Sequence, residues 1–163
     1  LEHFFKADSI FSTKTQLKRL CKEAREDSLK VVFTNGCFDV LHAGHVSYLE
    51  AAKELGDKLI VGINNDSSVR KLKGKDRPIN PLEERMKLIQ ALKCVDHVVS
   101  FSEETPLKLI EFLKPNILVK GADYSTEEIV GASSVIRDGG EVKTIPLIKG
   151  LSSSDKIKKI KQS

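Results

Sequence analysis

Apolar positions follow two different spacings along the chain. Leu17, Leu20, Cys21 and Ala24 recur at helical intervals behind Thr13, and Thr13-x-x-Gln16 resembles a capping box, so the pattern predicts a helix over 13–26. Short runs rich in apolar and β-branched residues indicate strands instead. We expect these strands at 30–34, 59–63, 96–100, 117–119 and 142–145.

Polar, helix-like segments separate the predicted strands. We expect helices over 43–55, 80–92, 105–113 and 153–160, and one that ends at Gly139-Gly140. Asn80 with Glu83, and Ser125 with Glu128, are the expected capping pairs of two of them. Residues 64–79 are predicted to form the longest polar loop.

This alternation predicts an α/β fold: a Rossmann-like, doubly wound, five-stranded parallel sheet with helices on both faces. The chain of 163 residues fits one domain over 1–163, with a core over about 30–161 and the N-terminal helix over about 13–26. In such sheets ligands bind beyond the carboxyl ends of the strands, near a reversal of strand order. The residues that follow each strand are therefore the candidates for a site.

Composition narrows the class of protein. Apolar residues make up 40% and charged residues 31%, which excludes disorder as the main state. Twenty-seven Lys and Arg against 23 Asp and Glu give a net charge of +4, which suits a protein that binds anionic small molecules and falls short of a nucleic-acid binder. No run is long enough for a membrane helix. The three widely spaced cysteines predict no disulfide framework or zinc site, and a cytoplasmic location.

The segment after the first predicted strand carries the strongest chemical signal. It reads Thr34-Asn-Gly-Cys-Phe-Asp-Val-Leu-His-Ala-Gly-His45, and the next helix begins inside it. A helix N-terminus offers unpaired N–H groups that attract phosphate, and His42 and His45 are spaced to face one ligand. Gly44 between them lets a ligand approach. A metal pair would need further ligands, which His3 and His97 are poorly placed to supply.

The motif resembles the H-x-G-H nucleotidyltransferase superfamily. The segments at 33–45, 72–74, 77–85, 119–124 and 139–142 together resemble the adenylyltransferase domain of ADP-heptose synthase, and the likeness covers essentially 13–161. That family joins ATP to D-glycero-β-D-manno-heptose 1-phosphate and releases pyrophosphate. The resemblance implies Mg²⁺ with ATP, a sugar 1-phosphate as second substrate, and a bacterial lipopolysaccharide or S-layer glycan pathway.

The resemblance also implies partners. Many members of that family carry this domain behind a sugar kinase, so this chain is similar to a stand-alone form or an excised domain, with a sugar kinase as a possible partner. Small members of the superfamily are often homodimers. Neither nucleic acid nor a membrane is expected as a partner.

Site residues follow from the same resemblance. It implies catalytic roles for His42, His45, Lys73 and Arg85, and no resident metal ligands. The residues expected to hold the nucleotide and its phosphates are Thr34, Asn35, Gly36, Cys37, Phe38, Asp39, Gly44, Arg77, Gly121, Asp123, Ser152, Ser153 and Ser154.

Several of these assignments leave an ordinary structural reading open. Asp39 could brace the turn, cap the helix or help to place Mg²⁺, and Arg85 could be a surface partner on its helix. Lys73 and Arg77 could be merely solvated. The family usually shows Ser-Thr-Thr where this chain has Ser152-Ser-Ser154, and one of these serines is expected to cap the last helix.

Other functions stay open at this stage. Glycerol-3-phosphate cytidylyltransferase shares the same histidine chemistry, with a different base and acceptor. A nucleotide-binding regulator without turnover is a second class. A nucleic-acid module is weaker, because the chain has no Trp and no interleaving of aromatic and basic residues. Aminoacyl-tRNA synthetases use the same turn, but this chain is too short for their tRNA-reading domains.

Overall fold

The described part of the chain forms seven α-helices and five strands. The computed structural model describes residues 11–122, 125, 128–146 and 153–162. The elements are α1 (Lys14–Glu26), β1 (Val31–Gly36), α2 (Ala43–Lys53), β2 (Lys58–Asn64), α3 (Asp66–Lys73), α4 (Leu82–Gln90), β3 (His97–Phe101), α5 (Leu107–Leu113), β4 (Ile117–Gly121), α6 (Ala132–Arg137), β5 (Glu141–Ile145) and α7 (Ser153–Gln162).

The five strands form one parallel sheet in the order β3-β2-β1-β4-β5, which confirms the predicted Rossmann-like fold. In its register Thr34 on β1 lies opposite Val61 on β2, and Phe33 lies opposite Leu118 on β4. The chain builds outward from β1 to β3 and then crosses to β4 on the other side. The strand order therefore reverses between β1 and β4, where this fold places its ligands.

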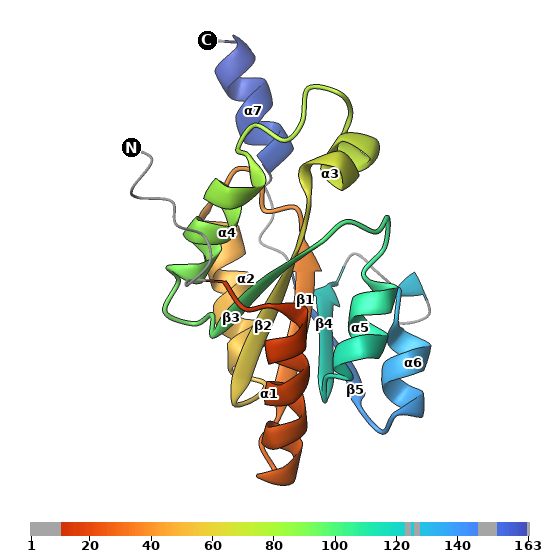
Figure 1. Cartoon of the computed structure of the whole chain (residues 1–163). Helices are drawn as coiled ribbons and strands as arrows, with labels where there is room; N and C mark the ends of the chain where they lie inside the picture. The colour runs from red at the N-terminus through yellow and green to blue at the C-terminus, as the bar shows by residue number, and fades with distance from the viewer. Residues whose placement is uncertain (1–10, 123–124, 126–127, 147–152, 163) are drawn as a thin grey trace.

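Helices cover both faces of the sheet, as predicted (Figure 1). Phe33 faces one side and packs in a buried cluster with residues of α1, α5 and α6, whereas Val32 faces the other side and packs with residues of α2 and α4. This alternation follows from the period of two in a β-strand. Helices α3 and α7 lie beyond the carboxyl ends of the strands, at the top of Figure 1.

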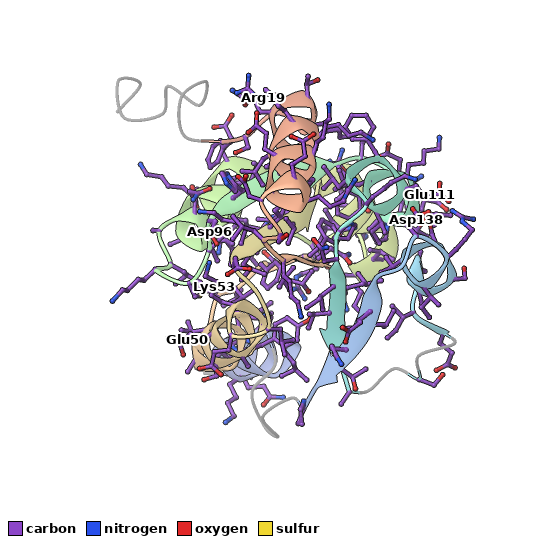
Figure 2. All side chains as sticks on the ribbon, turned by 90° about the horizontal axis from the view of Figure 1, so that it is seen from below. Arg19, Glu50, Lys53, Asp96, Glu111 and Asp138 are labelled. Carbon is purple, nitrogen blue, oxygen red and sulfur yellow. The ribbon has the colours of Figure 1, made fainter. Side chains whose placement is uncertain are left out.

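An ion-pair cluster lies at the end of the molecule opposite the carboxyl ends of the strands (Figure 2). Lys53 Nζ lies 2.6 Å from Asp96 Oδ2, which also accepts a hydrogen bond from the N–H of Leu59 at 2.7 Å. Burial raises the pKa of Asp96, but these two hydrogen bonds and the charges of Lys53 and Lys58 outweigh it and leave the pKa below its usual value. The cluster joins α2, β2 and the start of β3, away from the ligand end.

The predicted loop over 64–79 is wrong in its first half, which forms α3. Asn65 caps this helix by accepting a hydrogen bond from the N–H of Ser68 at 2.9 Å. Val69 is buried but Leu72 is 55% exposed. A helix of eight residues with one buried apolar side chain has no apolar stripe for a sequence pattern to reveal.

Two predicted caps are also wrong. Pro81 is the N-cap of α4, while the Asn80 side chain donates instead to the backbone oxygen of Asp39 at 2.6 Å. Ser125 and Glu128 do bond to each other, with the Ser125 hydroxyl 2.8 Å from Glu128 Oε2, but α6 begins only at Ala132. Within the described ranges, no helix has the length and apolar character needed to cross a bilayer.

Candidate active site

Two stacked imidazoles lie at the N-terminus of α2, just beyond the carboxyl end of β1. His42 is the N-cap residue, with extended backbone, and its carbonyl accepts a hydrogen bond from the N–H of His45 at 2.9 Å. The ring centroids are 3.7 Å apart and the planes differ by 18°. The structure thus brings together the two histidines that the motif predicts, as one unit at a helix N-terminus.

Phe38 supports this pair from the β1–α2 loop. Its ring meets His45 edge-on with centroids 5.2 Å apart, and its backbone is left-handed with φ 46°. A Cβ atom on Gly36 would lie 3.0 Å from the Phe38 ring. Gly36 therefore gives the ring room to pack beneath His45, a packing role beside the phosphate contact predicted for it.

Both histidines are biased toward the neutral form. Burial, and then the charge of His42, lower the pKa of His45 to about 4. Burial, and then the charge of Lys156, lower the pKa of His42. The Nδ1 atoms of both rings are buried and have no hydrogen-bond partner among the described residues. Neutral imidazoles of this kind can donate to a phosphate oxygen and take up a proton when negative charge arrives.

Asp39 braces two loops against each other, the first of the roles expected for it. It is 2% exposed, and its carboxylate accepts hydrogen bonds from Arg77 Nε and from the N–H groups of Ile79 at 2.7 Å and Asn80 at 2.9 Å. Asp39 therefore does not fit a ligand of resident Mg²⁺, and no three His, Cys, Asp or Glu side chains converge as metal ligands among the residues described. Arg77, predicted at phosphate, is paired here with Asp39.

Arg85 lies behind the site and has no exposed surface. Its guanidinium donates to the carbonyls of Cys37 at 2.6 Å, Asn64 at 2.9 Å and Asn80 at 3.0 Å, and to Asp66 Oδ1 at 2.7 Å. It joins the β1–α2 loop, the end of β2, the start of α3 and the loop before α4. The structure thus differs from the predicted catalytic contact and from a surface role: Arg85 positions the loops.

The Thr34 side chain is buried and forms its hydrogen bonds within the fold rather than facing a ligand. It is fully buried, and its hydroxyl donates to the carbonyl of Val119 at 3.0 Å. Since that bond uses its proton, the Tyr48 hydroxyl, 2.8 Å away, donates to Thr34. This differs from the phosphate contact predicted for Thr34, because the hydroxyl instead ties β1 to β4 and α2 at the reversal of strand order.

Sequence reasoning did not identify Lys120 as a site residue. Its Nζ donates to Asn35 Oδ1 at 2.5 Å and to the Asn35 carbonyl at 3.4 Å. Lys120 comes directly after the strand predicted at 117–119, and that position was the available signal. Gly121, the last residue of β4, is buried opposite Ile145.

Cationic side chains lie around the loop without making the Cys37 thiol reactive. Burial raises the pKa of Cys37, and the charges of Lys73, Arg85 and Arg77 only oppose that rise. The thiol is therefore protonated at neutral pH, which fits a mechanism without a covalent cysteine. Lys73 ends α3 and is exposed, and Gly44 lies between the two histidines in the first turn of α2.

Helix α7 docks on the β1–α2 loop. The Ser153 hydroxyl donates to the carbonyl of Val40 at 2.8 Å. Lys156, one turn further, lies on the same side of the helix, and its charge acts on His42. The sequence pattern gave Lys156 no role in the site. Asp123 and Ser152 lie outside the described residues, as does the side chain of Ser154.

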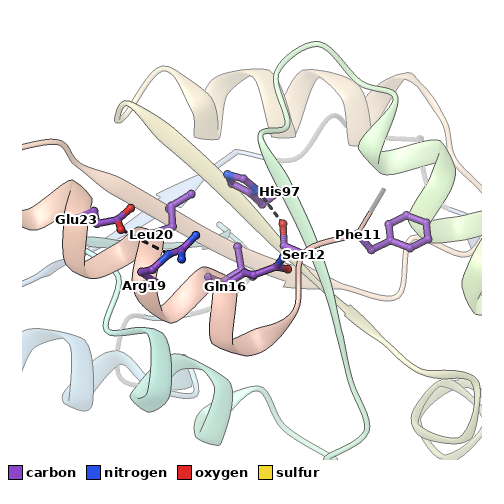
Figure 3. Close-up of a pocket in the computed structure, with 8 residues that line it drawn as sticks. Phe11, Ser12, Gln16, Arg19, Leu20, Glu23 and His97 are labelled. Carbon is purple, nitrogen blue, oxygen red and sulfur yellow. Dashed lines mark hydrogen bonds and ion pairs between the residues drawn. The ribbon is translucent and has the colours of Figure 1, made fainter. Parts of the chain in front are cut away.

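A groove of about 290 Å³ lies elsewhere, between the N-terminal end of α1 and the start of β3 (Figure 3). The Ser12 hydroxyl is 2.9 Å from His97 Nδ1 within it. The groove is on the α1 face of the sheet, whereas the histidine pair belongs to α2 on the other face. It is therefore separate from the candidate active site.

Comparison with known proteins defines the class. Residues 33–159 match the cytidylyltransferase-like family, and the chain belongs to that family. A crystal structure of the lipopolysaccharide core biosynthesis protein from Thermoplasma volcanium GSS1 is similar, with a TM-score of 0.61 and 33% identity over 74% of this chain and 98% of that one.

Relatives of higher identity are bifunctional proteins. The bifunctional protein HldE of Coxiella burnetii (strain RSA 493 / Nine Mile phase I) is 55% identical over 151 residues, which are 93% of this chain and 32% of that protein. The HldE of Photorhabdus laumondii is 53% identical over 149 residues, which are 91% of this chain and 31% of that protein. The chain thus spans about a third of the length of these curated relatives.

Proposed function

We propose that this chain is a nucleotidyltransferase that joins ATP and D-glycero-β-D-manno-heptose 1-phosphate to give ADP-heptose and pyrophosphate. The observation that carries the proposal is the stacked His42–His45 pair at the N-terminus of α2, beyond the reversal of strand order. Membership of the cytidylyltransferase-like family supports the reaction class. Similarity to HldE and to a lipopolysaccharide core biosynthesis protein supports the acceptor.

The reaction needs no protein nucleophile. A phosphate oxygen of the sugar 1-phosphate attacks the α-phosphorus of ATP, and a new P–O bond forms. The bond between the α-phosphorus and the oxygen that bridges it to the β-phosphorus breaks, and that oxygen leaves with pyrophosphate. The attacking phosphate is already anionic at pH 7, because its second pKa is about 6. The protein therefore contributes positioning and stabilisation of charge.

The histidines supply that stabilisation. Negative charge gathers on the α-phosphoryl oxygens and on the leaving pyrophosphate in the transition state. Neutral imidazoles at a helix N-terminus donate hydrogen bonds to this charge, and the half-buried position of His45 strengthens them by excluding water. Lys73 and Lys156 add exposed positive charge near the same loop. Mg²⁺ enters with ATP as part of the substrate.

Partners and location follow from the same proposal. ATP and sugar phosphates are cytoplasmic metabolites, so we propose that the chain acts in the cytoplasm. A sugar kinase, either separate or as a fused half, would supply the sugar 1-phosphate. A homodimer is the oligomeric state we propose to test.

Pyrophosphate release tests the function directly. The assay offers ATP or CTP, each with Mg²⁺, against heptose 1-phosphate or glycerol 3-phosphate. We expect release with ATP and the heptose phosphate alone. Release with CTP and glycerol 3-phosphate would keep the histidine mechanism and overturn the substrates. If none of the four pairs releases pyrophosphate although ATP still binds, the result would contradict the proposal and indicate a nucleotide-binding regulator.

A further inference from the structure

We propose that Lys120 is a positioning residue that fixes the side-chain amide of Asn35, so that Asn35 presents its NH₂ group as a hydrogen-bond donor to the nucleotide. The inference rests on the proposed function, since it places a nucleotide in the crevice between β1 and β4. The predicted site included Asn35 but neither Lys120 nor the contact between these two residues.

Geometry places the pair at the reversal of strand order. Asn35 is near the end of β1 and Lys120 near the end of β4, and these strands are adjacent and parallel. Phe33 and Leu118 belong to the same core cluster, so Asn35 and Lys120, two residues on, point to the same face. Asn35 is half-buried, which leaves part of it open to a ligand.

Hydrogen-bond chemistry fixes the orientation of the amide. An ammonium group only donates, so the Asn35 atom 2.5 Å from Lys120 Nζ must be the amide oxygen. Lys120 also lies 3.4 Å from the backbone oxygen of the same residue. Two oxygens of Asn35 therefore face one cation, and the amide NH₂ is directed away from it with two protons to donate. The ligand group that fits is an acceptor, such as a phosphate oxygen.

The substitution Asn35→Asp keeps the acceptor oxygen that faces Lys120 and removes the NH₂ donor that faces the ligand. The carboxylate still accepts from Lys120, so the contact between β1 and β4 remains. The end that faces the ligand changes from a donor to an acceptor, so we expect N35D to bind ATP about tenfold or more weakly while its melting temperature is kept. Asn35→Ala removes the donor without adding an acceptor, and a smaller loss is expected.

Lys120→Met leaves Asn35 in place but frees its amide to turn. We expect ATP affinity to fall about three- to tenfold, and K120R, which can donate to the same oxygens, to restore part of it. A double-mutant cycle distinguishes positioning from direct contact. If Lys120 acts through Asn35, K120M costs nothing further in an N35A background.

The experiment is calorimetric titration of ATP into the wild type, N35A, N35D, K120M, K120R and N35A/K120M, with melting temperatures for each. Lys143→Met, a lysine on the neighbouring strand β5, is the matched control and should bind ATP like the wild type. A parallel KM for heptose 1-phosphate shows whether the acceptor rather than the nucleotide receives the hydrogen bond.

Two results of the ATP titrations would overturn the inference. One is additive loss in the cycle, which would mean that Lys120 touches the nucleotide itself. The other is N35D with wild-type ATP affinity, which stays informative even if K120M fails to fold. An effect confined to the KM of the acceptor would also contradict the assignment to the nucleotide. Wild-type pyrophosphate release tests the proposed function separately, so the two failures are distinguishable.

Discussion

Neither ring of the His42–His45 pair can hold a proton easily in the free protein. The rings stack at 3.7 Å, so a charge on one opposes a charge on the other, and burial opposes both. A bound triphosphate reverses that balance, because nearby negative charge favours the imidazolium. At the scale of the residue, the histidine pair is therefore expected to respond to a bound anion by taking up a proton more readily.

Removing either imidazole is expected to remove this response. We predict that His42→Ala and His45→Ala each reduce turnover about a hundredfold or more, the usual effect of losing one preorganised donor. The fold should persist, since His42 makes no side-chain capping bond and neither Nδ1 has a described partner. Pyrophosphate release and circular dichroism measure the two effects. Wild-type turnover in both variants would refute the assignment.

His45 should also make stability depend on pH. Its pKa of about 4 in the folded chain lies below the ordinary value of 6.5. Between these values the unfolded chain binds the proton more readily, so stability falls as the pH drops from about 6.5 toward 4. We predict that His45→Gln, which cannot be protonated, flattens this part of the profile. Urea unfolding at pH 7.5, 6, 5 and 4 measures it, and parallel profiles for both proteins would contradict the prediction.

At the scale of elements, the regular parts of the fold were predictable and the irregular contacts were not. All five strands and α1, α2 and α5 lie close to their expected positions, because their apolar spacing is set by burial against the sheet. The helix α3 was missed because Val69 is its one buried apolar side chain.

The site residues also divide into those that the sequence could predict and those that it could not. The histidine pair was predictable because both residues lie in one helical turn. The roles of Asp39 and Arg85 were not, because all their side-chain partners but one lie 19 to 48 residues away in sequence and no periodicity links them. The exception is the carbonyl of Asn80, five residues before Arg85. Lys120 bonds to Asn35 across 85 residues, which only the pairing of β1 with β4 brings together.

Arg85 is the link between these elements, and its removal should unfold them together. We predict that Arg85→Met lowers the free energy of unfolding by about 3–5 kcal/mol, because it leaves three buried or half-buried carbonyls and Asp66 without their donor. Arg85→Lys should recover little, since one ammonium cannot reach four acceptors in a fork.

Urea unfolding measures this loss, with Arg19→Met as control. Arg19 is an exposed arginine on α1 whose pair with Glu23 is at the surface, so its replacement should change stability little. If R85M kept wild-type stability but lost turnover, Arg85 would be catalytic after all.

At the scale of the whole molecule, the small net charge of +4 is less informative than its distribution. Lys73 and Lys75 are exposed at the end of α3 and just after it, on the ligand side of the sheet. The far end carries the Lys53–Asp96 pair, in which charges of both signs cancel. A polyanion that approaches the ends of the strands therefore meets the positive charges of Lys73 and Lys75.

This distribution predicts a salt-dependent affinity for ATP. Exposed charges are screened within about 10 Å at 0.1 M ionic strength, so the Kd for ATP should rise several-fold between about 0.05 and 0.5 M KCl. The double variant Lys73→Gln/Lys75→Gln should bind ATP more weakly at low salt and show a shallower rise. Lys22→Gln/Lys93→Gln has the same net charge, but its substitutions lie in the second half of α1 and just after α4, away from the site, so it should keep the wild-type slope. Equal slopes for the two double variants would mean that net charge, and not its placement beside the histidines, draws the nucleotide in.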